Sequence, residues 1–262
     1  MTATDGSTDP EAQPRRARHT AGGGGHSPGA PVQELEWAHT GTGFFARHLD
    51  ALTDAELAEP SLLPGWTRAA VVAHVAYNAR ALSRLCAWAR TGVETPMYAS
   101  FEQRNAEIDE GARLPAQELR ELFGRSADLL HADWDELTDD AWDAVVRTAQ
   151  GRPVPCRETA WMRNREVWIH AVDLDSGGSF RDLPPAVVDR LTEDVLGAWR
   201  GREEAVDLVL APDDRGERIV VGAGEGPTVV GSAADLARWL TGRDGHRLES
   251  STGTLPDLPR WL

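Results

Sequence analysis

Cysteine is scarce in this sequence, with only Cys86 and Cys156 among 262 residues. Two cysteines cannot supply the disulfide framework that stabilises small secreted proteins. The N-terminus has no apolar segment of the kind found in secretory signals, and the chain contains no run of 18 apolar residues. We therefore expect a cytoplasmic protein with reduced thiols that does not span a membrane.

Positive charge is also in short supply. The chain has 27 lysine and arginine residues against 42 aspartate and glutamate residues, which gives a net charge of −15. A surface with this balance repels nucleic acids and anionic membranes. The composition thus argues against nucleic-acid or membrane partners and says little else about function. We expect the protein to be a monomer.

Apolar residues make up 41% of the chain, enough for one large domain or two ordinary ones. Residues 1–32 differ from the rest, because they contain four consecutive glycines, repeated prolines and a basic cluster around Arg16. Such a segment lacks the apolar residues of a core and is predicted to be a disordered tail. The remaining sequence divides near Gly178 into residues 33–178 and 179–262.

Residues 33–178 have the apolar periodicity of helices. Four principal helices are predicted, with a shorter one at 101–110, and their ranges are 32–52, 68–90, 115–137 and the stretch around 161–174. Thr67 is a predicted N-cap, and Gly177 marks the expected end of the fourth helix. Residues 138–155 read as a loop with short extended pieces. This pattern predicts a four-helix bundle.

Residues 179–262 differ in their sequence pattern, which predicts strands as well as helices. A helix is predicted at 184–199, followed by strands at 206–210, 218–221 and 228–230. A second helix is predicted at 232–240, with Ser232 as its N-cap, and a last strand at 247–250. The fold class is therefore mostly α, a four-helix bundle with a smaller C-terminal α+β domain.

The fourth bundle helix carries Glu166 and His170 at positions i and i+4, so both side chains lie on one face. Their apolar neighbours predict that both point into the interior, where an unpaired charge is costly. A divalent metal would satisfy both groups, and so would a hydrogen bond between them. His74 on the second helix adds a second imidazole. Two histidines and one glutamate suit Zn²⁺ with one open position, but an ordinary bundle with satisfied histidines explains the pattern as well.

Several separated motifs help to decide between a metal site and an ordinary bundle with satisfied histidines. Pro64-Gly65-Trp66-Thr67-Arg68, residues 72–79, and residues 161–163 and 165–174 closely resemble the mycothiol-dependent maleylpyruvate isomerases. Residues 250–253 and 259–262 are similar to the C-terminal end of that family. The resemblance covers residues 33 to 262, and its motifs follow the family's order, which makes it far more specific than any single motif.

The resemblance implies a DinB-like metal-binding four-helix domain at 33–178 and a smaller C-terminal domain at 179–262. It assigns one Zn²⁺ per chain to His74, Glu166 and His170 and makes mycothiol the thiol cofactor. It also places a C-terminal arginine at the active site, and the matching residue is Arg243. A guanidinium there would hold a substrate carboxylate or stabilise an enolate. The residues that contact mycothiol are not assigned.

The implied reaction converts maleylpyruvate to fumarylpyruvate in gentisate degradation. A thiolate can add to the conjugated alkene, the resulting single bond can rotate, and the thiolate can leave again. A metal ion suits this chemistry because it holds a thiol deprotonated at neutral pH.

Three alternatives remain open. The first is another mycothiol-dependent enzyme on the same scaffold, a thiol S-transferase. The second is a non-catalytic bundle protein that binds metal or thiol, although such a protein has no need for Arg243 over the open coordination position. The third uses Cys156 as a nucleophile, but the resemblance gives this residue no role.

Overall fold

The structure is a computed structural model that describes residues 1–2 and 27–261. Most of the predicted disordered tail, residues 3–26, lies outside the described residues. Residues just before the first helix make defined contacts, because the Gly29 amide donates to Asp139 Oδ1 at 2.8 Å. The folded part therefore begins a few residues before the expected boundary at residue 33.

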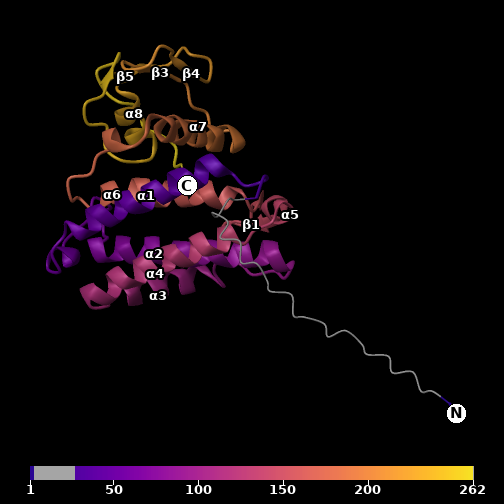
Figure 1. Cartoon of the computed structure of the whole chain (residues 1–262). Coiled ribbons are helices and arrows are strands. Elements are labelled where there is room, and N and C mark those ends of the chain that lie inside the picture. Colours follow the sequence, from indigo (N-terminus) through magenta and orange to yellow (C-terminus); the bar gives the residue numbers. More distant parts are fainter. Residues whose placement is uncertain (3–26, 262) are drawn as a thin grey trace.

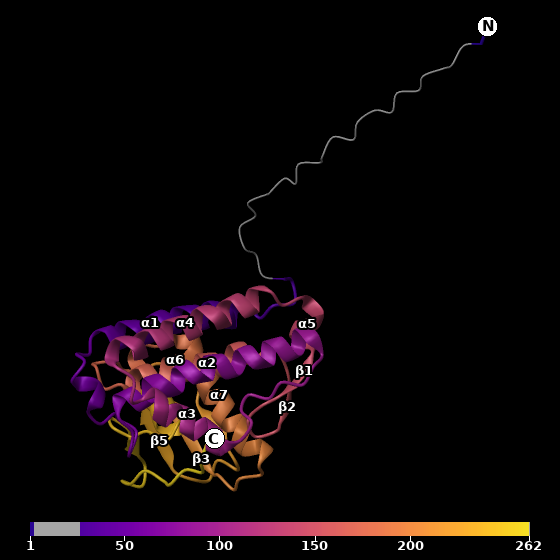
Figure 2. The same ribbon diagram turned by 90° about the horizontal axis from the view of Figure 1, so that it is seen from below.

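Four long helices form the bundle that the sequence predicts (Figures 1 and 2). α2 packs against both α4 and α6, and α1 packs against α6. The shorter α3 lies beside α2. The bounds of these helices are α1 (Val32–Asp50), α2 (Arg68–Thr91), α3 (Phe101–Gly111), α4 (Ala116–Asp135) and α6 (Glu158–Asp173).

Capping residues set several of these helix ends. The Thr67 hydroxyl accepts a hydrogen bond from the Ala70 amide at the start of α2, as predicted. Gly92 ends α2 in a left-handed conformation, with φ of 71°. The predicted end of α6 at Gly177 is wrong, because the helix stops at Asp173 and Asp175 already has a positive φ. Gly177 lies in the following turn.

The connection before α6 contains one element that the sequence did not reveal. Residues Asp139–Asp143 form the short helix α5, capped by the Thr138 hydroxyl. The expected extended pieces are confirmed as a two-stranded antiparallel ribbon of β1 (Val145–Arg147) and β2 (Pro153–Pro155). Five residues are too few to show helical periodicity, so α5 was not predictable from the pattern.

The C-terminal region combines two helices with a small mixed sheet, as expected. The sheet order is β4-β3-β5-β6, with β3 and β5 parallel and the outer pairs antiparallel. In Figure 1, α7 lies between this sheet and the bundle. The bounds are α7 (Pro185–Gly201), β3 (Leu208–Pro212), β4 (Ile219–Val221), β5 (Thr228–Gly231), α8 (Ala233–Leu240) and β6 (Glu249–Ser250).

One apolar core crosses the boundary between the two regions. It joins Phe45 and Val72 of the bundle to Leu191 of α7 and Leu210 of β3, all of them fully buried. Burial of this kind is worth about 1.5–3 kcal/mol for each large side chain. The shared core fixes the C-terminal region against the bundle, in which α6 carries two of the three predicted metal ligands.

The helices α1 and α6 approach each other closely at Gly41. A Cβ atom there would lie 2.6 Å from Val167 Cγ2 and 2.7 Å from Trp168 Nε1, so only glycine fits without movement. Trp168 and Val167 follow directly after Glu166 and hold this face of α6 against α1. None of the helices in the described part of the chain is long and apolar enough to cross a membrane.

Candidate metal centre

The structure brings together the three residues that the sequence singled out. Glu166 and His170 lie one turn apart on α6, and His74 reaches them from α2. Glu166 Oε2 lies 2.8 Å from His74 Nε2 and 3.3 Å from His170 Nε2. One ligand atom from each residue can be chosen so that all three lie within 4.8 Å of one another.

These residues fit a bound zinc ion. Within the described residues, the buried Glu166 Oε2 faces both imidazoles at short range but accepts no hydrogen bond of normal geometry. Two imidazole nitrogens and one carboxylate oxygen converging on one point are the donor set of a catalytic zinc site, which leaves a fourth position open. The side chains of Glu166 and His170 are 18% and 15% exposed. They therefore face a pocket, not the apolar interior expected from their neighbours in the sequence.

Asp173 orients one of the two histidines. His170 Nδ1 lies 2.8 Å from Asp173 Oδ2, and the Asp173 side chain has no exposure to solvent. A carboxylate accepts here, so Nδ1 carries the proton, and Nε2 is the atom that faces Glu166. Metal-binding histidines commonly donate their other ring N–H to a carboxylate in this way. Sequence analysis missed Asp173, although it follows His170 by three residues and thus shares its helix face.

Arg243 is close to the centre but its guanidinium pairs with Asp173. Nη2 donates to Asp173 Oδ2 at 2.5 Å and Nε donates to Oδ1 at 3.2 Å, while Nη1 donates to the Thr241 carbonyl at 2.6 Å. Arg243 therefore makes with Asp173 the kind of two-pronged contact that was expected between Arg243 and a substrate carboxylate. A chain of contacts therefore runs from Arg243 through Asp173 to His170. Arg243 nevertheless lines a pocket with both α6 ligands.

The charges at the centre depend on one another. Burial by itself would raise the pKa of Glu166, but His74 and His170 hold it well below its usual range. Burial lowers the pKa of His74, against the opposing effect of Glu166. Burial would also lower the pKa of His170, but Asp173 and Glu166 together raise it to about 9. A metal ion binding to His170 at neutral pH would thus displace a proton, which makes metal affinity pH-dependent.

His74 has a second contact that bears on metal binding. Arg104 of α3 lies with Nη2 3.2 Å from His74 Nδ1, and because arginine can only donate, Nδ1 accepts here. A metal on Nε2 would move the ring proton to Nδ1, and Arg104 would then have to turn away. Arg104 is therefore the residue expected to change position when the centre is loaded.

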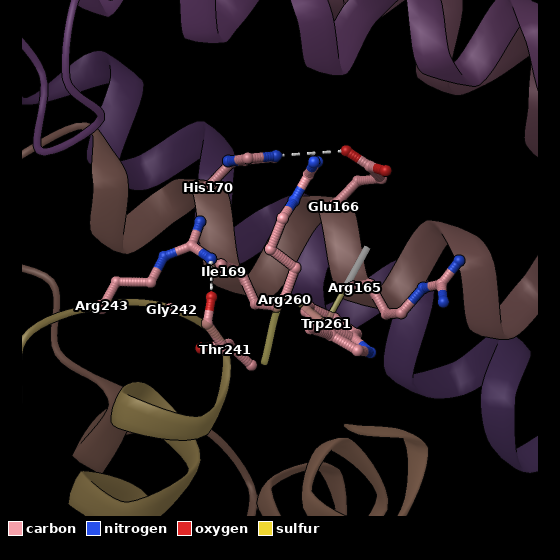
Figure 3. Close-up of a pocket in the computed structure, with 9 residues that line it drawn as sticks. All are labelled: Arg165, Glu166, Ile169, His170, Thr241, Gly242, Arg243, Arg260 and Trp261. Atoms are coloured by element: carbon pink, nitrogen blue, oxygen red, sulfur yellow. Dashed lines mark hydrogen bonds and ion pairs between the residues drawn. The ribbon is translucent and has the colours of Figure 1, made fainter. Parts of the chain in front are cut away.

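Two cavities meet at the metal centre. Glu166, His170, Arg165 and Trp261 belong to the walls of both. The small pocket has a volume of about 290 Å³ and is shown in Figure 3; its lining is Arg165, Glu166, Ile169, His170, Thr241, Gly242, Arg243, Arg260 and Trp261. The large cleft has a volume of about 1220 Å³ and extends past His74, Tyr98 and Arg152 to α7.

Other candidate residues lie away from both cavities. Cys156 is fully buried and lines neither cavity. His131 stacks loosely with His39 and Trp134, His48 contacts Ser176, and His246 is exposed. None of these four histidines lines the small pocket or the large cleft described above.

Comparisons with known proteins agree with this centre. Residues 38–175 match the model of the mycothiol maleylpyruvate isomerase N-terminal domain family. A crystal structure of the mycothiol-dependent maleylpyruvate isomerase is 44% identical, with a TM-score of 0.84, covering 88% of this chain and 96% of that one. A histidine-to-alanine variant of that isomerase is 43% identical, with a TM-score of 0.83 and the same coverage. No curated protein gave a significant match. The chain therefore belongs to the mycothiol-dependent maleylpyruvate isomerase family.

Proposed function

We propose that the protein is a zinc- and mycothiol-dependent cis–trans isomerase that converts maleylpyruvate to fumarylpyruvate in gentisate degradation. The observation that supports this most is the convergence of His74, Glu166 and His170 where two cavities meet. The similarity to an isomerase along nearly the whole described chain supports the reaction class. We expect one zinc ion per chain, and a cytoplasmic monomer.

The reaction class requires addition of a thiolate to the conjugated alkene, rotation about the new single bond, and elimination. When bound, zinc would supply the positive charge that keeps a thiol deprotonated at neutral pH. His74, Glu166 and His170 would hold the ion, and Asp173 would keep the His170 ring oriented. Arg243, anchored on Asp173, would add positive charge beside the carbon skeleton as an enolate forms.

The size of the two cavities suggests how the two small molecules divide between them. Mycothiol is a glycosylated, acylated cysteine and is much larger than a seven-carbon diacid. The large cleft has room for such a cofactor and presents mixed polar groups that can bind hydroxyls, including Thr148, Gln150 and Glu193. The small pocket has the size of a small-molecule site and carries more positive charge for its volume.

A turnover assay tests the proposal. Zinc-loaded protein is given maleylpyruvate with and without mycothiol, and fumarylpyruvate formation is followed. We expect turnover only when both zinc and mycothiol are present. Thiol transfer to other electrophiles without isomerisation would indicate the S-transferase alternative, and binding without any turnover would indicate a non-catalytic protein.

Variants of the ligands link this activity to the centre. Replacing His74 with Ala removes one of three zinc ligands, so zinc content and turnover should fall together. His246→Ala is the matched control, because this histidine is exposed and lines neither cavity. Full zinc content in a variant with all three ligands replaced by Ala would show that the metal site is elsewhere.

A further inference from the structure

Arg163 is a fully buried arginine in the interior of the helical bundle. It lies on α6, three residues before Glu166. Its Nη1 donates to the Val75 carbonyl at 2.6 Å and to Asn78 Oδ1 at 3.3 Å, and both acceptors belong to α2. Its other nitrogens, Nε and Nη2, have no hydrogen-bond partner among the described residues. The hydrogen bonds of this guanidinium therefore go to uncharged groups, and no described carboxylate accepts one.

These contacts connect the two helices that carry the predicted zinc ligands. Val75 follows His74 directly, and Asn78 lies one turn further along α2. A neutral side chain that donates to the same carbonyl could make such a connection at lower cost, because burying a cation without a paired anion is expensive. The two hydrogen bonds of Arg163 therefore do not explain why a positive charge is kept at this depth.

The groups that face Arg163 show where its charge acts. They are Glu166 on α6, Tyr98 in the segment before α3, and His131 on α4. Burial lowers the pKa of Arg163 to about 10, against the opposing effect of Glu166, so the guanidinium stays protonated at neutral pH. Burial, and then Glu166, raise the pKa of Tyr98 to about 12, and burial, and then Arg163, lower the pKa of His131 to about 4. Glu166 is thus the one member of this set with a charge opposite to that of Arg163.

Glu166 is also a predicted zinc ligand, so a metal ion would bring a second cation into this neighbourhood. Arg163 and the ion repel each other, and together they favour a negative charge at the open coordination position. A thiolate gains from the charge of Arg163, whereas a neutral thiol does not. The thiol proton would leave to solvent.

We propose that the buried charge of Arg163 promotes ionisation of the thiol that binds at the open position of the metal centre. This inference rests on the proposed function for the presence of zinc and a thiol cofactor. Side chains three residues apart on a helix are neighbours, so Arg163 is close to the centre without being a ligand. A unit charge at roughly 10 Å, in a medium with an effective dielectric constant of about 20, shifts a pKa by about one unit.

Cobalt-substituted protein measures this ionisation without any turnover. Co²⁺ takes the place of Zn²⁺, and a thiolate bound to Co²⁺ gives a charge-transfer absorption band that a free thiol does not give. N-acetylcysteine is the probe, because it is the acylated cysteine part of mycothiol. The band is recorded against pH, and its midpoint is the apparent pKa of the bound thiol.

Arg163→Gln should raise this midpoint by about one unit. Its zinc affinity, measured by competition with a chelator, should stay at the wild-type level or increase, because a like charge is removed. A merely structural Arg163 gives the opposite pattern, in which loosened ligands lower zinc affinity and the midpoint does not move. Arg163→Met is a second neutral variant in case Arg163→Gln does not fold, and Arg163→Lys should restore part of the wild-type midpoint.

Arg120→Gln is the matched control. Arg120 also connects two segments by donating to backbone carbonyls, those of Leu49 and Leu52, but it lies on α4 and lines neither cavity. This variant removes one positive charge from the protein and should leave both the midpoint and the zinc affinity unchanged. A midpoint that is unchanged in the folded neutral variants of Arg163 would overturn the proposal, and so would the lack of a thiolate band in the wild type.

The isomerase assay separates this proposal from the proposed function. If the wild type binds the thiolate but does not convert maleylpyruvate, the proposed function is refuted, and the shifted midpoint in Arg163→Gln still supports the role of Arg163. If the wild type isomerises maleylpyruvate and the midpoints are equal, the proposed function is supported and the role of Arg163 is refuted.

Discussion

Arg243→Ala should reduce zinc affinity as well as turnover, because Arg243 reaches the centre through Asp173. The variant leaves a fully buried carboxylate with His170 as its remaining charged partner. Breaking a buried ion pair by removing one partner costs about 3–5 kcal/mol of folding stability. A disturbed carboxylate behind a metal-bound histidine costs about 10- to 100-fold in metal affinity. Both losses are expected, and turnover at limiting zinc should fall with them.

A double-mutant cycle tests whether Arg243 acts on the metal centre through Asp173. Asp173→Asn keeps the shape of the side chain and removes its charge. If Arg243 affects the metal through Asp173, adding Arg243→Ala to Asp173→Asn should change zinc affinity little further. The coupling energy should then lie in the range of about 0.5–3 kcal/mol that interacting neighbours show. Zinc affinity is measured by competition with a chromogenic chelator, and stability by urea unfolding of the metal-free protein.

A second arginine–aspartate pair provides the control. Arg181, in the short helix η2 (Phe180–Asp182), contacts Asp235 through Nη2 at 2.5 Å and Nε at 3.4 Å. Asp235 is buried and neither residue lines the two cavities. Arg181→Ala should therefore lower stability without changing zinc affinity. Equal losses of zinc affinity from Arg243→Ala in the wild-type and Asp173→Asn backgrounds would refute the coupling.

Three further predictions concern residues outside the centre. Cys156→Ala should retain turnover in the isomerase assay, because this buried thiol lines neither cavity; loss of activity with intact zinc binding would revive its role as a nucleophile. Deleting residues 2–26 should leave the unfolding temperature and turnover nearly unchanged, because their composition lacks apolar residues for a core, and a drop of several degrees would show that they pack. Burial, and then the nearby Arg163, lower the pKa of His131 to about 4, so the unfolded chain binds a proton that the folded chain does not between about pH 6.5 and 4. Stability should fall as the pH falls through that window, and His131→Gln should make the fall shallower in urea unfolding; an identical slope would show that His131 does not contribute.

Local patterns predicted the helices well because each signal lies within a few residues. The cap at Thr67 and the apolar periodicity of residues 68–90 required no knowledge of the rest of the chain. The pairing of Glu166 with His170 is equally local, since both lie on one helix. His74 was added as a candidate from its place on the second helix, but the choice of a metal site over an ordinary bundle depended on the resemblance to a family, because no local pattern reveals which residues of two helices face each other.

Long-range contacts were beyond this kind of prediction. Asp173 belongs to the motif at residues 165–174, but its hydrogen bond with Arg243 joins residues from different regions of the chain. Because the sequence does not reveal that contact, Arg243 was expected to bind a substrate carboxylate. Arg260 belongs to the C-terminal motif at residues 259–262, but its position in the pocket depends on a long-range contact. Arg202 donates to the carbonyl of the neighbouring Trp261 and so fixes the backbone there. Tertiary packing decided the positions of both arginines.

The close approach of α1 and α6 at Gly41 has a consequence for the engineering of this scaffold. A methyl group at position 41 would push against Val167 and Trp168, and the relief available is a displacement of α6 away from α1. Glu166 and His170 would travel with that helix, whereas His74 on α2 would not. Position 41 thus offers a way to alter the spacing of the ligands, and with it the choice of metal ion, while every residue that faces the substrate keeps its identity.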